Sequence, residues 1–93
     1  MAKRVLLAED EPNIVESLTS ILERSGFEVA TTTNGRQALE VAQSDTPDIL
    51  ILDVMLPELD GYEVLRRLRA DARTKTPPVL MVMAKGQRED REK

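Results

Sequence analysis

The chain contains no cysteine, no histidine and no tryptophan among its 93 residues. Without cysteine it forms no disulfide and performs no thiol chemistry. The absence of histidine removes the usual general base and the commonest ligand of transition metals. Any bound metal must therefore be held by oxygen, which favours magnesium, calcium or manganese over zinc or copper.

Positive charge is also scarce relative to negative charge. Seventeen acidic residues against thirteen Lys and Arg give a net charge of −4. Binding to phosphate backbones requires a clustered positive field, so we expect no direct contact with nucleic acid. No stretch is apolar over the roughly 20 residues that cross a bilayer, and the N-terminus lacks the apolar length of a signal peptide. We expect one domain, located in the cytoplasm and not in a membrane.

Short apolar runs alternate with segments of helical periodicity. The expected strands are residues 5–8, 27–30, 49–52 and 79–83, of which the second alternates in polarity as an edge strand does. Pro12 suits the first turn of the first helix and Gly26 its end. Asn34-Gly35 is interpreted as a turn and Asp60 as the N-cap of the third helix. Strands that alternate with helices predict right-handed βαβ units around a parallel sheet.

The last expected strand lacks a neighbour. Residues 79–83 are apolar on both faces, yet the sequence that follows consists mainly of charged residues and cannot form another strand. We therefore interpret residues 1–93 as a C-terminally incomplete domain that continues with another helix, a fifth strand and a final helix. A chain that ended at Lys93 is expected to dimerise through the edge of its fourth strand.

Acidic residues follow two of the expected buried strands. Glu9 and Asp10 come directly after the first strand, and Asp53 ends the third. Functional groups of an open parallel sheet gather at the carboxyl ends of its strands, so three carboxylates would meet there if these strands are neighbours. Two such charges about 5 Å apart repel by roughly 3 kcal/mol at an effective dielectric constant near 20. Magnesium suits the cluster, because it binds one or two carboxylates and shares phosphate oxygens with a substrate.

Each acid also has an ordinary structural explanation. Glu9 and Asp10 would suit the positive end of the first helix dipole, and Asp53 would suit a turn after a strand. For each residue taken alone, this explanation is preferable. Their combination in one βαβ framework, with Asp53 directly after four apolar residues, favours a functional site.

Three segments together resemble the receiver domains of two-component response regulators, and the resemblance covers the whole chain. The segments are residues 5–12, 51–62 and 79–86. The resemblance implies a flavodoxin-like, doubly wound α/β sheet of strand order 2-1-3-4-5. Relative to that order, residues 1–93 lack the fifth strand and the last helices.

The resemblance also implies roles for individual residues. Asp53 would be the phosphoacceptor, which takes a phosphoryl group from a sensor histidine kinase or a phosphotransfer protein. Glu9, Asp10 and Asp53 would bind Mg2+ together with the backbone carbonyl of Met55. The positions that would flank the phosphoryl group are Met55, Ala84 and Lys85. A domain of this kind is not an enzyme in the usual sense, since it relays a signal to an output domain or a downstream protein.

One position departs from the family. Receiver domains usually have threonine or serine at the end of the fourth strand, at the switch position where this chain has Met83. A thioether cannot donate a hydrogen bond to a phosphoryl oxygen. The chief alternative is therefore a pseudo-receiver, a protein-interaction module with impaired switching.

Two other classes of protein use a similar fold or a similar aspartate. A phosphatase of the haloacid-dehalogenase type would need a second acid two residues after its nucleophile, where this chain has Met55. A flavodoxin would need aromatic side chains around the flavin, and this chain has one Phe and one Tyr. Both are weaker interpretations than a receiver domain.

Overall fold

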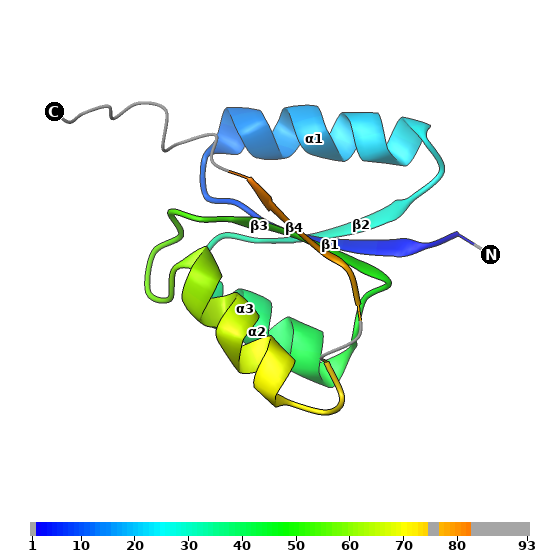
Figure 1. The fold of residues 1–93 in the computed structure, drawn as a ribbon. Coiled ribbons are helices and arrows are strands. Elements are labelled where there is room, and N and C mark those ends of the chain that lie inside the picture. Colours follow the sequence, from blue (N-terminus) through cyan, green and yellow to red (C-terminus); the bar gives the residue numbers. More distant parts are fainter. Residues whose placement is uncertain (1, 75–76, 83–93) are drawn as a thin grey trace, which may run out of the picture.

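The computed structural model describes residues 2–74 and 77–82 of the chain. Four strands and three helices alternate in the order β1 (Arg4–Ala8), α1 (Pro12–Arg24), β2 (Glu28–Thr32), α2 (Gly35–Ser44), β3 (Ile49–Asp53), α3 (Gly61–Ala70) and β4 (Val79–Val82). The strands form one parallel sheet of order β2-β1-β3-β4. Figure 1 shows α1 on one face of the sheet and α2 with α3 on the other. The predicted doubly wound, flavodoxin-like sheet is therefore confirmed.

The two central strands are buried on both faces, because helices lie above and below them. The larger core fills the space between the sheet and the α2–α3 layer, and it includes Leu6, Leu50, Leu52, Val64 and Leu68. A smaller core lies under α1 around Val5, Leu7 and Ile51. These two layers cover both faces of β1 and β3, whose ends lie side by side.

The strand β2 lies at the edge of the sheet, as its alternating polarity predicts. It begins at Glu28 and extends to Thr32, two residues beyond the predicted end at Ala30. The extension pairs Thr32 with Ala8 at the end of β1. Its β-branched threonines suit extended backbone, a signal that outweighs their polarity.

The strand β4 differs from the prediction of a fully buried strand. Its residues are half-buried or exposed, and Leu80 is 56% exposed. Leu80 pairs with Ile51 and so lies on the face of the sheet that carries α1. Within the part of the chain that the structure describes, β4 pairs with β3 alone. The predicted last residue of this strand, Met83, lies outside the described residues.

Polar side chains cap the helices. Asp60 caps α3 as predicted, since its Oδ1 accepts a hydrogen bond from the Glu63 N–H at 2.9 Å. The interpretation of Asn34-Gly35 as a free-standing turn is wrong. Asn34 is the N-cap of α2, and its Oδ1 accepts from the Gln37 N–H at 2.8 Å.

The role of Asn34 as the N-cap of α2 can be tested by substitution. Asn34→Ala should lower the free energy of unfolding by about 1 kcal/mol, because it leaves an N-terminal N–H of α2 without its acceptor. Asn34→Asp is the matched control, since it keeps the acceptor oxygen and adds charge at the favourable end of the helix dipole. Urea unfolding followed by circular dichroism measures both. Equal losses in the two variants would contradict the capping role.

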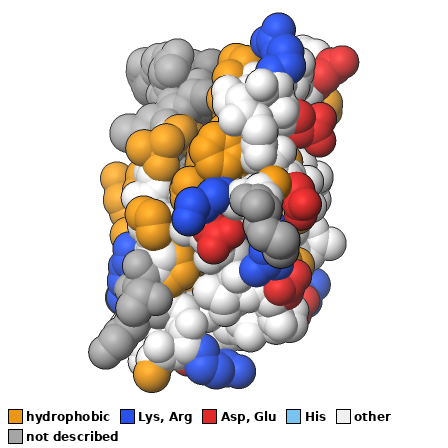
Figure 2. Space-filling model, turned by 90° about the vertical axis from the view of Figure 1, so that its right-hand side faces the viewer, with side chains coloured by type: hydrophobic (Ala, Val, Ile, Leu, Met, Phe, Trp, Pro, Cys, Tyr) orange, Lys and Arg blue, Asp and Glu red, His pale blue; other side chains and the backbone are white. Residues whose placement is uncertain are grey.

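Two further features bear on the classes of partner. On the face drawn in Figure 2, basic and acidic side chains lie interspersed, without a large patch of one sign among the coloured residues. Arg4 and Asp45 form an ion pair, and their Nη1 and Oδ1 lie 2.7 Å apart. No helix in the described ranges has the length and apolar character needed to cross a membrane.

Candidate metal centre

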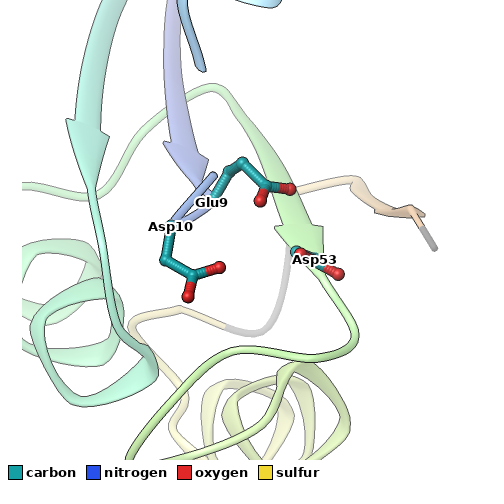
Figure 3. A group of neighbouring side chains, drawn as sticks. All are labelled: Glu9, Asp10 and Asp53. Carbon is teal, nitrogen blue, oxygen red and sulfur yellow. The ribbon is translucent and has the colours of Figure 1, made fainter. Parts of the chain in front are cut away.

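The three predicted carboxylates come from the ends of two neighbouring strands. Parallel pairing sets Ala8 opposite Leu52, so Glu9 and Asp53 follow at the same edge of the sheet. One oxygen from each of Glu9, Asp10 and Asp53 lies within 4.8 Å of the others. Figure 3 shows the group where β1 and β3 end. The predicted meeting of these three side chains is confirmed.

Glu9 is held by backbone contacts on both sides. Its N–H donates to the carbonyl of Thr32 at 3.0 Å, which extends the pairing of β1 with β2 by one residue. Its Oε2 accepts from the Glu11 N–H at 2.9 Å. Glu11 in turn caps α1, because its Oε1 accepts from the Asn13 N–H at 3.0 Å. Glu9 thus contributes to the turn before α1 and directs a carboxylate to the sheet edge at the same time.

Asp53 is the last residue of β3, and its side chain bonds to the loop that follows. Its Oδ1 accepts from the Met55 N–H at 3.0 Å. The next residue is tied in as well, since the Val54 N–H donates to the carbonyl of Val82 at 2.9 Å. These bonds orient the Asp53 carboxylate and bring the backbone of Met55 beside it.

Burial makes this cluster electrostatically unusual. Glu9 and Asp53 are 0% exposed, whereas Asp10 is more open to solvent. Each pair of charges at this separation repels by roughly 3 kcal/mol at an effective dielectric constant near 20. The sum is comparable to the whole stability of a small domain, about 5–15 kcal/mol. A cation bound by the carboxylates removes this repulsion, and an all-oxygen donor set suits magnesium, calcium or manganese.

Two glycines allow other segments to approach the site, and their role was missed in the sequence. A Cβ on Gly61 would lie 2.5 Å from the backbone oxygen of Asp53, so α3 begins directly against the end of β3. A Cβ on Gly35 would lie 1.7 Å from the backbone oxygen of Leu59, in the loop between β3 and α3. In the sequence both glycines look like ordinary turn or loop residues. Their close contacts involve residues further along or back in the chain, which the local pattern does not reveal.

The remaining predicted positions have different outcomes. Met55 bonds to Asp53 through its N–H, and the residue is 49% exposed. The role of its carbonyl as a metal ligand stays a prediction. The switch position Met83 and the flanking positions Ala84 and Lys85 lie outside the described residues. Their roles stay predictions too.

Comparison with known proteins decides the family. Residues 5–93 match the family described as response regulator receiver domain. The chain belongs to this family. Receiver domains are signalling modules of two-component systems, so the predicted family and fold are both confirmed.

Curated relatives of this receiver domain include bacterial proteins of two lengths. The alkaline phosphatase synthesis transcriptional regulatory protein PhoP of Bacillus subtilis is 44% identical over 91 residues, which cover 98% of this chain and 37% of PhoP. Protein PilH of Pseudomonas aeruginosa is 34% identical over 88 residues, which cover 95% of this chain and 73% of PilH. The chain thus spans little more than a third of PhoP and most of PilH.

Solved receiver structures share the fold. The receiver domain of a sensor histidine kinase from Pseudomonas aeruginosa, described with a magnesium ion coordinated in its active site cleft, has a TM-score of 0.87 at 30% identity. This match covers 99% of our chain and 75% of that one. The N-terminal domain of a response regulator receiver protein from Methanoculleus marisnigri has a TM-score of 0.84 at 36% identity, and the match covers 90% of our chain and 68% of that one.

Proposed function

We propose that this receiver domain accepts a phosphoryl group on Asp53, with Mg2+ bound by Glu9, Asp10 and Asp53. The observation that carries the proposal is the set of three carboxylates whose oxygens lie within 4.8 Å of one another at the carboxyl edge of the sheet. The magnesium ion described for the P. aeruginosa receiver domain supports the choice of metal.

Asp53 would act as the nucleophile. A carboxylate oxygen attacks the phosphorus atom in line, a new P–O bond forms, and the bond to the donor nitrogen or oxygen breaks with its electron pair. Glu9, Asp10 and Asp53 would hold Mg2+, which would supply positive charge to the phosphoryl oxygens. The Met55 N–H donates to Asp53 Oδ1 and so helps to orient the carboxylate. Histidine within the chain is not needed, because the attacking group is the Asp53 carboxylate and the leaving group belongs to the donor.

The finer roles follow the family pattern. The backbone carbonyl of Met55 is proposed as a further metal ligand, which its position beside Asp53 supports. Met55, Ala84 and Lys85 are proposed to flank the phosphoryl group, and Met83 to weaken the coupling between phosphorylation and a surface change, because it has no hydroxyl.

The proposed partners are the two ends of a phosphorelay. A sensor histidine kinase or a phosphotransfer protein would supply the phosphoryl group in the cytoplasm. An output domain or a downstream protein would receive the signal, as the longer transcriptional relatives suggest. Contact with DNA or a membrane is not proposed for these residues, and pairing with a second copy through the edge of β4 stays a prediction.

Phosphorylation of Asp53 can be tested by intact mass spectrometry. Incubation with Mg2+ and acetyl phosphate should add one phosphoryl group to the wild-type chain and none to Asp53→Asn. Asp60→Asn is the matched control, because Asn caps α3 as Asp does and the residue lies outside the carboxylate cluster.

The outcome separates the candidate functions. Modification of wild type and Asp60→Asn alone supports the phosphoacceptor role. An unmodified wild-type protein would favour the pseudo-receiver alternative, and modification that persists in Asp53→Asn would place the acceptor elsewhere.

A further inference from the structure

The loop of residues 54–60, between β3 and α3, is clasped by the N-terminus of α2. The Gly35 N–H donates to the carbonyl of Pro57 at 3.0 Å. Gly35 also approaches the carbonyl of Leu59 so closely that a Cβ would meet it. A side-chain contact completes the clasp, since Arg36 Nε donates to Glu58 Oε1 at 2.9 Å. All three contacts join α2 to residues 57–59.

Glu58 has an unusual backbone conformation at the centre of this clasp. Its φ is 70°, and no other non-glycine residue in the described ranges has a positive φ. The Leu59 N–H donates to the carbonyl of Pro57 at 2.9 Å, which closes a three-residue γ-turn around Glu58. Such a conformation is strained for an L-residue and persists where the surroundings hold it. Gly35 holds the backbone of this turn, and Arg36 holds its side chain.

Arg36 is itself anchored on α2. Its Nη1 donates to Glu40 Oε2 at 3.0 Å, one helical turn further along. The hydrogen bond to Glu58 is the largest cause that raises the pKa of Arg36, followed by the charges of Glu58 and Glu40. Arg36 and Glu58 are about half exposed, so their pairing adds little to global stability. Its effect should therefore be local to the loop.

The same loop adjoins the carboxylate site at both of its ends. It begins after Asp53, whose Oδ1 accepts from the Met55 N–H, and it ends at Gly61 against the backbone oxygen of Asp53. Residues 57–59 are separated from Met55 by Leu56 alone, so the position of this turn is coupled through a short stretch of backbone to the residue that bonds to Asp53.

We propose that Arg36 and Glu58 are positioning residues for the metal and phosphoacceptor site. Their ion pair holds residues 54–60 in the conformation that binds Mg2+ beside Asp53. The inference rests on the proposed function, since it assigns the pair a part in the same site. Neither residue touches the metal or the phosphoryl group in this proposal, and each acts through the loop.

Mg2+ titration by calorimetry tests the proposal on the full chain. Arg36→Gln and Glu58→Gln should each weaken Mg2+ binding about two- to fivefold, the range of an exposed ion pair. The double variant should bind no more weakly than the weaker single variant, because both remove one contact. Glu40→Gln is the matched control, since it removes the other partner of Arg36 without touching the loop. Exchanging the charges, with Arg36→Glu and Glu58→Arg together, should restore part of the affinity.

The sign of the Arg36→Gln effect separates positioning from bulk electrostatics. Loss of a positive charge near a cation site would by itself strengthen Mg2+ binding. Weaker binding therefore requires a change in loop geometry. In metal-free buffer, amide hydrogen exchange of residues 55–59 should be faster in Arg36→Gln and Glu58→Gln than in Glu40→Gln, while melting temperatures stay close to wild type.

The possible failures are distinguishable. A wild-type protein that binds no Mg2+, or binds it equally well as Asp53→Asn, would overturn the proposed function and the positioning role with it. Asp53-dependent binding that is unchanged in Arg36→Gln and Glu58→Gln would overturn the positioning role alone, as would loop exchange equal to that of Glu40→Gln.

Discussion

Gly35→Ala should lower the free energy of unfolding by about 3 kcal/mol or more. The added Cβ would lie 1.7 Å from the oxygen and 2.6 Å from the carbon of the Leu59 carbonyl. Both atoms belong to the backbone, so no change of rotamer relieves the overlap. Either α2 or the loop before α3 must move, and the packing between these two helices would be lost in part. For a domain with a total stability of about 5–15 kcal/mol, such a loss is large.

Gly26→Ala provides the comparison for this effect. Gly26 has φ 96° but no atom within 4 Å of an added Cβ. Alanine there costs only the left-handed conformation, about 1–2 kcal/mol. Urea unfolding of the two variants, with equal m-values, measures the difference. If Gly35→Ala lowers the free energy of unfolding by no more than Gly26→Ala does, the close approach of Gly35 to the Leu59 carbonyl would be contradicted.

Magnesium should stabilise the wild-type domain strongly and Asp53→Asn weakly. At a free Mg2+ concentration about 100 times the dissociation constant, the expected gain is ~2.7 kcal/mol, because only the folded state brings the three carboxylates together. In metal-free buffer, the order of stability of wild type and Asp53→Asn should reverse. Asp53→Asn should be more stable than wild type by about 1–3 kcal/mol. It removes two repulsive pairs near 5 Å, whose unscreened sum of about 6 kcal/mol is reduced by solvent at the more exposed Asp10.

The substitution suits this test, because Asn keeps an Oδ1 that accepts from the Met55 N–H. Thermal melts with EDTA and with excess Mg2+ measure both halves of the prediction. Asp60→Asn should respond to Mg2+ as wild type does, as it lies outside the cluster. A wild-type melting temperature indifferent to Mg2+, together with a lower one for metal-free Asp53→Asn, would show that the cluster does not bind the metal.

The sequence was sufficient for features that depend on local pattern. Runs of apolar residues marked β1 and β3, and an acid directly after each run located the site. Parallel pairing of those strands then determines that Glu9 and Asp53 meet, so this prediction needed only the fold class. The cap at Asp60 was also readable, because N-capping depends on one residue and the helix that follows it.

Features that depend on contacts between distant segments could not be predicted from the sequence. Arg36 and Glu58 are 22 residues apart, and each taken alone looks like an ordinary exposed charge. The pair Asn34-Gly35 is a strong turn signal, so the sequence predicts a turn where the structure has the N-cap of α2. The exposure of Leu80 depends on which elements cover the sheet, a property of packing that an apolar run does not reveal.

The order β2-β1-β3-β4 has a consequence for the unfolded chain. Glu9 and Asp53 meet across neighbouring strands, yet 44 residues of sequence separate them. A flexible chain of that length has a mean end-to-end distance of about 35 Å, well beyond the Debye length of about 8 Å at physiological salt. The unfolded ensemble therefore carries almost none of the repulsion between these groups, and the reference state is electrostatically relaxed. The repulsion of Asp53 with Glu9 and Asp10 therefore belongs to the native state, whereas Glu9 and Asp10 are neighbours in both states. A divalent ion that binds all three carboxylates at this edge recognises the tertiary structure.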